Sequence, residues 1–201
     1  MGQGRPNQSM STFVAIDPSM NNWGYAKGRL IQGNKYTVDE IGLIRPKDTK
    51  SLSRFVNEQD ALKVRSVVLQ LRQLLTGIDY VFVEAPHGSQ SAAAMKSYGM
   101  VIAVLGSLEL LAGESVHVQF TRANDRRSVI YPEPMKGNVA IPKEDVIAWA
   151  EKKYPELPYP RKKDGSLISG KVEHIADALA CMCFSLENTL NKEFVHECSI
   201  H

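Results

Sequence analysis

The chain has 201 residues, of which 43% are hydrophobic and 23% are charged, and its formal net charge is +2. This length predicts one domain that can bury a full hydrophobic core without disulfides or metal ions as cross-links. No apolar run is long enough to span a membrane, and residues 1–11 lack the apolar core of a secretory signal. The three cysteines have no disulfide-framework spacing, so we expect a soluble protein of a reducing, cytoplasmic compartment.

The first part of the chain predicts an α/β domain that begins as an antiparallel meander. Short apolar runs predict buried strands, and apolar residues spaced three and four apart predict amphipathic helices. We expect strands at 12–17, 23–30, 35–44, 79–84 and 115–120, and helices at 58–76 and 91–111. The Gly-containing turn between the second and third strands favours a hairpin, and the later strand-helix-strand alternation favours parallel pairing.

The second part of the chain predicts two helices separated by open connections. Residues 121–141 show no periodicity, and a connection of this length inside a compact domain is usually functional. Pro142 is expected to begin a helix that Pro155 ends, and the last helix is predicted over 171–190. We therefore expect a flexible tail at 1–11, one domain at 12–190 and a polar tail at 191–201.

Acidic residues end two of the predicted core strands. The apolar run at 13–16 ends at Asp17, the run at 80–83 ends at Glu84, and a proline follows each acid within two residues. An acid that merely begins a turn is the ordinary interpretation of either strand end alone. Because ligands bind at the carboxyl ends of the strands in α/β sheets, the repetition favours a site that contains both acids.

The last predicted helix supplies two more candidate residues. His174 and Asp177 are three residues apart and therefore share one helical face, which borders the apolar stripe. Buried polar side chains need partners, and Asp17 and Glu84 can supply this setting if the helix packs across the strand ends. Three carboxylates and an imidazole would repel one another without a cation, and this donor set suits Mg²⁺ or Mn²⁺. Two such ions can activate a water molecule and stabilise the leaving oxygen of a phosphodiester.

These residues together resemble the RuvC-type Holliday junction resolvases. The resemblance rests on Asp17 with the following Gly24-Tyr25-Ala26, on Glu84 ahead of an Ala- and Ser-rich helix, and on the run from His174 to Ala180. It covers about residues 12–190, and the tails and spacing are more similar to a divergent phage or plasmid member than to the common bacterial form. The chain departs from the family in having Ser19 after Asp-Pro and His87 where some members place an aromatic wedge.

The resemblance implies a fold, a reaction and a set of partners. The fold would be RNase H-like, with a five-stranded mixed sheet in which strands 1–3 are antiparallel and strands 1, 4 and 5 are parallel. The activity would be metal-dependent cleavage of four-way or other branched DNA that leaves 5′-phosphate ends. Asp17, Glu84, His174 and Asp177 would hold two Mg²⁺ or Mn²⁺ ions. Symmetric cleavage would need a homodimer, and the helices at 58–76 and 91–111 are its expected surface.

A basic region in the second half of the chain fits a DNA partner. Residues 122–171 contain 11 Lys and Arg against 7 Asp and Glu, a net charge of +4. We predict that its two loops contact DNA phosphates, together with one lysine of the helix at 91–111. The predicted contacts are Lys96, Arg122, Arg126, Arg127, Lys136, Arg161, Lys162, Lys163 and Lys171.

Other functions stay open at this point. A nuclease of the same fold could act on RNA or flap DNA, and a DNA-binding module could keep the fold after losing its chemistry. An actin-like ATPase also has an Asp at the end of its first strand, but this sequence shows no second glycine-rich phosphate loop after a later Asp.

Overall fold

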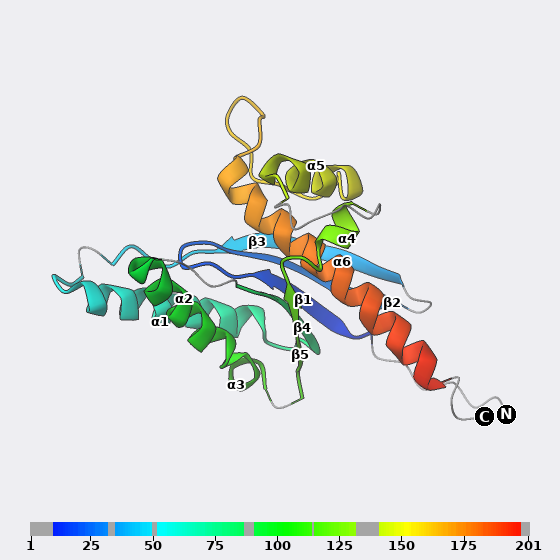
Figure 1. The fold of residues 1–201 in the computed structure, drawn as a ribbon, viewed down its shortest axis with the longest axis horizontal. Coiled ribbons are helices and arrows are strands. Elements are labelled where there is room, and N and C mark those ends of the chain that lie inside the picture. The colour runs from blue at the N-terminus through cyan, green and yellow to red at the C-terminus, as the bar shows by residue number, and fades with distance from the viewer. Residues whose placement is uncertain are drawn as a thin grey trace.

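The structure is a computed structural model that describes residues 10–31, 35–49, 52–86, 91–113, 115–131 and 141–197. This part of the chain contains five strands and six helices, beginning with three consecutive strands and ending with three consecutive helices (Figure 1). The strands are β1 (Thr12–Asp17), β2 (Trp23–Ile31), β3 (Lys35–Ile44), β4 (Tyr80–Ala85) and β5 (His117–Arg122). The helices are α1 (Val56–Leu74), α2 (Ala92–Leu105), α3 (Leu108–Ala112), α4 (Arg127–Ile130), α5 (Lys143–Lys153) and α6 (Ser169–Glu197).

The strands form one mixed sheet in the order β3-β2-β1-β4-β5. β1 pairs antiparallel with β2, and β2 pairs antiparallel with β3. β4 lies parallel to β1 on the other side and is itself parallel to β5. The predicted five-stranded mixed sheet is therefore confirmed in both strand direction and pairing.

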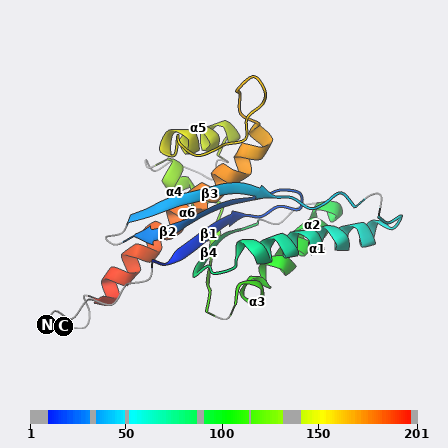
Figure 2. The ribbon, with the colours of Figure 1, turned by 180° about the vertical axis from the view of Figure 1, so that it is seen from behind.

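Alternating side chains of the central strands divide the core into two layers. Phe13 and Ala15 of β1 pack with α5 and α6, whereas Val14 and Ile16 pack with α1, α2 and α3. Successive residues of a strand point to opposite faces, so this short apolar run supplies both cores. Figures 1 and 2 show α4, α5 and α6 on one side of the sheet and α1, α2 and α3 on the other.

The predicted helix at 91–111 is wrong in one respect, because the structure has two helices there. α2 ends at Leu105 and α3 begins at Leu108, with Gly106 and Ser107 between them. The hydroxyl of Ser107 donates to the carbonyl oxygen of Val104 at 2.8 Å, which satisfies a carbonyl near the end of α2. Glycine followed by a serine that bonds to the backbone is a helix ending that apolar periodicity does not reveal.

α6 is longer than predicted, and one short helix was not predicted. α6 begins at Ser169 and ends at Glu197 rather than spanning 171–190, so the expected tail from residue 191 is helical for most of its length. No Gly or Pro occurs in residues 191–197 to stop the helix. α4 has four residues, too few to give a detectable period, and it lies within the connection 121–141 that was predicted to be irregular.

Candidate active site

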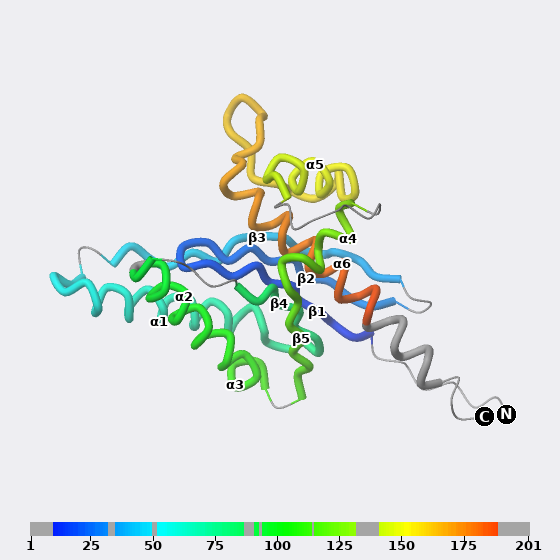
Figure 3. The backbone as a smooth tube through the Cα atoms, in the orientation of Figure 1, coloured from blue at the N-terminus to red at the C-terminus, as the bar shows by residue number. Residues whose placement is uncertain are grey.

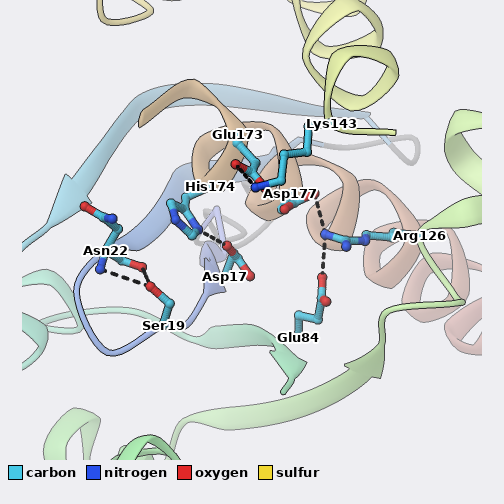
Figure 4. Close-up of polar contacts among 9 residues, drawn as sticks. All are labelled: Asp17, Ser19, Asn22, Glu84, Arg126, Lys143, Glu173, His174 and Asp177. Atoms are coloured by element: carbon cyan, nitrogen blue, oxygen red, sulfur yellow. Dashed lines mark hydrogen bonds and ion pairs between the residues drawn. The ribbon is translucent and has the colours of Figure 1, made fainter. Parts of the chain in front are cut away.

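Asp17 and Glu84 lie at the same end of neighbouring parallel strands. The strand register pairs Ile16 with Val83, so Asp17 and Glu84 follow at the same level of β1 and β4. Phe13, Ala15 and Phe82 belong to the core beneath α6, and the period of two puts Asp17 and Glu84 on that face as well. Figure 4 shows both carboxylates directed toward α6. The alternation that builds the core therefore also aims the two acids.

His174 of α6 is hydrogen-bonded to Asp17. Its Nδ1 donates to Oδ2 of Asp17 at 2.7 Å, because a carboxylate can only accept (Figure 4). This hydrogen bond raises the pKa of the His174 imidazole above its usual range, while burial opposes the rise. It also fixes the ring so that Nε2 is the nitrogen left to act as an acceptor or ligand.

Asp177 and Glu84 lie on either side of Arg126, a residue beside the start of α4. Nη1 of Arg126 is 2.9 Å from Oε2 of Glu84 and forms a second ion pair with Oδ1 of Asp177 (Figure 4). Each acid is only 8% exposed. Neither carboxylate oxygen, nor Nη1 of Arg126, makes a well-aligned hydrogen bond with any described residue. The guanidinium therefore balances the charge of the two acids without satisfying their hydrogen-bonding capacity.

Burial dominates the electrostatics of the two inner acids. It raises the pKa of Glu84 to about 8, although the positive charge of Arg126 opposes the rise. It also raises the pKa of Asp177 to about 6, with a further contribution from the negative charge of Asp17. Both acids would ionise more readily if additional positive charge were placed between them.

The rim of the site carries a further ion pair that the sequence did not suggest. Glu173 lies 2.7 Å from Nζ of Lys143 at the start of α5 and retains only 18% side-chain exposure. This pair links α5 to the first turns of α6 beside His174 (Figure 4). The pair adds no net charge at the mouth of the site, and the side chain of Lys143 remains 69% exposed there.

The four predicted site residues suit a divalent cation by their chemistry. Three carboxylates and one imidazole are present, and two buried carboxylate oxygens have no aligned hydrogen bond to a described residue. As they lie, the side chains form two pairs, Asp17 with His174 and Glu84 with Asp177 across Arg126. Within the described ranges no three His, Cys, Asp or Glu side chains are arranged to ligate one ion. The guanidinium of Arg126 occupies the space between Glu84 and Asp177, which is where a metal ion would be favoured.

The structure separates the predicted DNA contacts into three groups. Arg126 is part of the acid site, and Lys96 is on the far layer, where it pairs with Asp60 of α1 at 2.5 Å. The predicted contact Lys136 lies outside the described residues, and so does His87, the residue at the place of an aromatic wedge. The others border the α5–α6 side of the molecule or the turn that follows β5. They are Arg122, Arg127, Arg161, Lys162, Lys163 and Lys171.

Arg126 is the site residue whose position the sequence did not reveal. We predicted it as one of several basic loop residues, whereas its guanidinium is inserted between two acids and its side chain is only 18% exposed. The available signal was local: Asp125 accepts a hydrogen bond from the backbone N–H of Arg122 at 2.7 Å, which closes a tight turn directly after β5. That turn carries the following residue back over the strand ends.

Comparisons with known proteins agree with this fold. No family model matches the chain, and no curated protein matches its sequence. Among solved structures, Thermus thermophilus RuvC in complex with a Holliday junction substrate has a TM-score of 0.57 at 14% identity, over 87% of this chain and 97% of that one. The fowlpox virus resolvase in its Holliday junction complex has a TM-score of 0.56 at 17% identity, over 89% and 99% of the two chains.

A third similar structure is the yeast mitochondrial Holliday junction resolvase. Its TM-score is 0.60 at 11% identity, over 90% of this chain and 81% of that one. The likeness extends over nearly the full length of each chain, and the sequences have diverged too far for residue roles to be transferred from identity. The chain thus has the RNase H-like fold of the RuvC-type Holliday junction resolvases.

Proposed function

We propose that this protein is a divalent-metal-dependent endonuclease that cuts branched DNA, with the four-way junction as its principal substrate. The observation that carries the proposal is the meeting of Asp17, Glu84, His174 and Asp177 at one edge of the sheet, although up to 160 positions separate them along the 201-residue chain. Three solved structures of the same fold are named as resolvases of Holliday junctions, and two of them are complexes with the junction.

The residues have separate parts in this proposal. Asp17, Glu84, His174 and Asp177 would hold two Mg²⁺ or Mn²⁺ ions. The ions would supply Lewis acidity and an activated water molecule for attack on the phosphodiester, giving a 5′-phosphate and a 3′-hydroxyl. His174 is held by Asp17 so that Nε2 is presented, and Arg126 holds Glu84 and Asp177 close together despite their like charges.

A homodimer follows from the proposed reaction, since symmetric cleavage of a four-way junction needs two active sites. The α1–α3 layer exposes several large apolar side chains on the side of the sheet opposite α6. They are Phe55 at 74%, Val56 at 62%, Leu69 at 53%, Ile102 at 40% and Leu110 at 87% exposure. Scattered exposed apolar residues are common, but this number on one layer favours a partner surface. We propose that the two copies meet there, which leaves the α6 side available to DNA.

The experiment compares the wild-type protein with Asp17→Asn on a synthetic four-way junction, in the presence of Mg²⁺ or Mn²⁺. We expect paired, symmetric cuts by the wild type and a loss of at least about a hundredfold in cleavage by Asp17→Asn. Asp39→Asn is the matched control, because Asp39 is 37% exposed and pairs with Arg29 on the surface. It should cleave at the wild-type rate.

A substrate panel distinguishes junction cleavage from cleavage of other nucleic acids. The same two variants are assayed on a flap, a linear duplex and an RNA–DNA hybrid. Preferential cleavage of the hybrid or the flap would replace the junction in the proposal. Undiminished cleavage by Asp17→Asn would contradict the proposed active site.

A further inference from the structure

An open cleft of about 220 Å³ lies beside the candidate site, between the end of β3 and the first turn of α6. Its β3 side includes Leu43 and Arg45, and its opposite side includes Pro158, Pro160 and Lys171. The sequence predicted Lys171 as a DNA contact but assigned no role to Arg45 or to the cleft between the two residues. The cleft combines two cationic side chains with rigid apolar walls.

The sheet register places this cleft at the same end of the strands as the acids. Asp17 pairs with Gly24 on β2, and Gly24 pairs with Leu43 on β3. Neighbouring strands are about 4.8 Å apart, so Leu43 lies two strands, or about 10 Å, from Asp17. On the other side, Lys171 is three residues before His174 and therefore about one helical turn from it.

The charge of the cleft is uncompensated. No acidic side chain lines it, and neither Arg45 nor Lys171 forms an ion pair with a described residue. Other cations of the same side are neutralised: Lys143 pairs with Glu173, and Arg161 pairs with Glu151 at 2.9 Å. Two unpaired cations over proline walls suit an anion whose charge is not supplied by the protein itself.

A rigid hairpin rises next to this cleft and extends its positive surface. Arg161 forms an antiparallel bridge with Leu167, and the backbone N–H of Lys162 donates to the carbonyl oxygen of Ser166 at 2.7 Å. Gly165 takes the left-handed conformation, with φ of 86°, that closes the turn. Figures 1 and 3 show the hairpin projecting beyond α5 and the start of α6.

The arginine and the two lysines of the hairpin differ in their contacts. Arg161 is committed to the fold, because its guanidinium donates to Glu151 of α5 and to the carbonyl oxygen of Gly165 at 3.0 Å. Lys162 and Lys163 are exposed and make no ion pair within the described ranges. The hairpin is thus braced by one cation and presents the other two to solvent.

We infer that the cleft binds a backbone phosphate of the DNA strand that is cut, through Arg45 and Lys171, and that Lys162 and Lys163 contact the phosphates beyond it. This inference rests on the proposed nuclease function. The separation of about 10 Å from Asp17 corresponds to about two to three nucleotides from the scissile phosphate, given a rise of about 3.4 Å per nucleotide along the helix axis and a longer path along the strand. The cleft would then fix the register of the strand in the active site without reading its bases.

The first test measures junction binding over a series of salt concentrations, with every variant in the Asp17→Asn background so that no cleavage occurs. We expect the double variant Arg45→Met, Lys171→Met to bind about tenfold or more weakly, and its slope of log affinity against log salt to fall by about one to two. Arg29→Met is the matched control, because it removes an arginine that is already paired with Asp39. It should keep the slope of the parent.

The second test changes the DNA and leaves the protein intact. A neutral methylphosphonate is placed at each position around the cut, and binding by the Asp17→Asn variant is measured. We expect one position, about two to three nucleotides from the cut, to weaken binding in the parent but not in the double variant. An unchanged salt slope in the double variant, or a methylphosphonate effect that persists in it, would overturn the inference while leaving the nuclease proposal intact. If the parent does not bind the junction at all, the proposed function fails and the inference falls with it.

Discussion

Gly24 of β2 lies directly beneath the backbone of His174. A Cβ atom at position 24 would be 2.0 Å from the carbonyl oxygen of His174 and 2.2 Å from its carbonyl carbon. The absence of a side chain at this position lets α6 approach the sheet closely enough for His174 to reach Asp17. The glycine is therefore a structural condition for the pairing of two residues that are 157 positions apart.

Gly24→Ala should destabilise the protein and separate His174 from Asp17. The obstructing atoms are backbone, which cannot move aside as a flexible side chain could, so we expect a loss of about 1–3 kcal/mol or more in the free energy of unfolding. Thermal denaturation and junction cleavage measure the two effects. Gly99→Ala is the control, because an added Cβ there meets no atom within 4 Å and the site is inside helix α2. It should raise stability by about 0.5–1 kcal/mol. Equal behaviour of the two variants would contradict the close-packing argument.

The sequence predicts the sheet well because its pattern is local. The run Phe13–Ile16 is apolar at every position, as a strand buried on both faces must be, and the acid that ends it lies where the strand ends. The break between α2 and α3 could not be predicted in the same way. It depends on Gly106 and on a side-chain hydrogen bond from Ser107, whereas the apolar pattern continues across both.

The candidate site was predictable in its acids and not in its arginine. Asp17 and Glu84 each interrupt a buried apolar strand, and Asp177 interrupts a buried helical face, so each produces a visible contrast in the sequence. Arg126 lies in an aperiodic, basic stretch where one more arginine gives no contrast. Its insertion between Glu84 and Asp177 is a property of the turn after β5 in three dimensions. Arg45 escaped prediction for a related reason, since only the register shows that the end of β3 borders the site.

Arg126→Met should destabilise the metal-free protein, because it leaves two buried acids without their counter-charge. Removing one partner of a buried ion pair costs about 3–5 kcal/mol. The loss should be greater at about pH 8 than at about pH 6, since the carboxyls that have lost Arg126 are tolerated only when protonated. Thermal denaturation in a chelator at the two pH values measures this.

Arg126→Lys and Arg122→Met are the matched controls for that variant. The lysine keeps the positive charge and should recover part of the stability, and Arg122 is exposed on the same turn, so its loss should have little effect. We also expect Mg²⁺ or Mn²⁺ to raise the melting temperature of Arg126→Met more than that of the wild type, because the guanidinium no longer competes for the acids. A metal-free Arg126→Met protein as stable as the wild type at both pH values would show that the ion pairs contribute nothing.

Glu84 should make the stability of the metal-free protein depend on pH. Burial raises its pKa from the ordinary value of 4.5 to about 8, so over this window the folded protein holds a proton that the unfolded chain has lost. The free energy of unfolding therefore falls as the pH rises, by up to about 1.4 kcal/mol per pH unit for one proton. Glu84→Gln cannot titrate and should show a shallower fall between about pH 6.5 and 8.5.

Two other titratable groups also affect the pH dependence of the free energy of unfolding. Asp177, with a pKa of about 6, is already largely ionised within that window, so it contributes little to the difference. His174 has a raised pKa because of its hydrogen bond to Asp17, and its contribution is also lost as the pH rises. This residual slope should be shared by the wild type and Glu84→Gln. Identical pH profiles of the two proteins would show that Glu84 does not titrate in this range.

His174→Asp should exchange a stabilising contact for a repulsive one and change the preferred cation. The hydrogen bond from Nδ1 to Asp17 at 2.7 Å would be replaced by two facing carboxylates, so the metal-free variant should melt at a lower temperature than the wild type. An all-carboxylate donor set suits Mg²⁺, whereas the imidazole suits Mn²⁺ better, so the ratio of cleavage in Mg²⁺ to cleavage in Mn²⁺ should rise. His174→Asn keeps a polar side chain without the charge, and it should lose the hydrogen-bonded ring without gaining the repulsion. A His174→Asp protein with an unchanged cation preference would indicate that residue 174 positions Asp17 and does not itself ligate the ion.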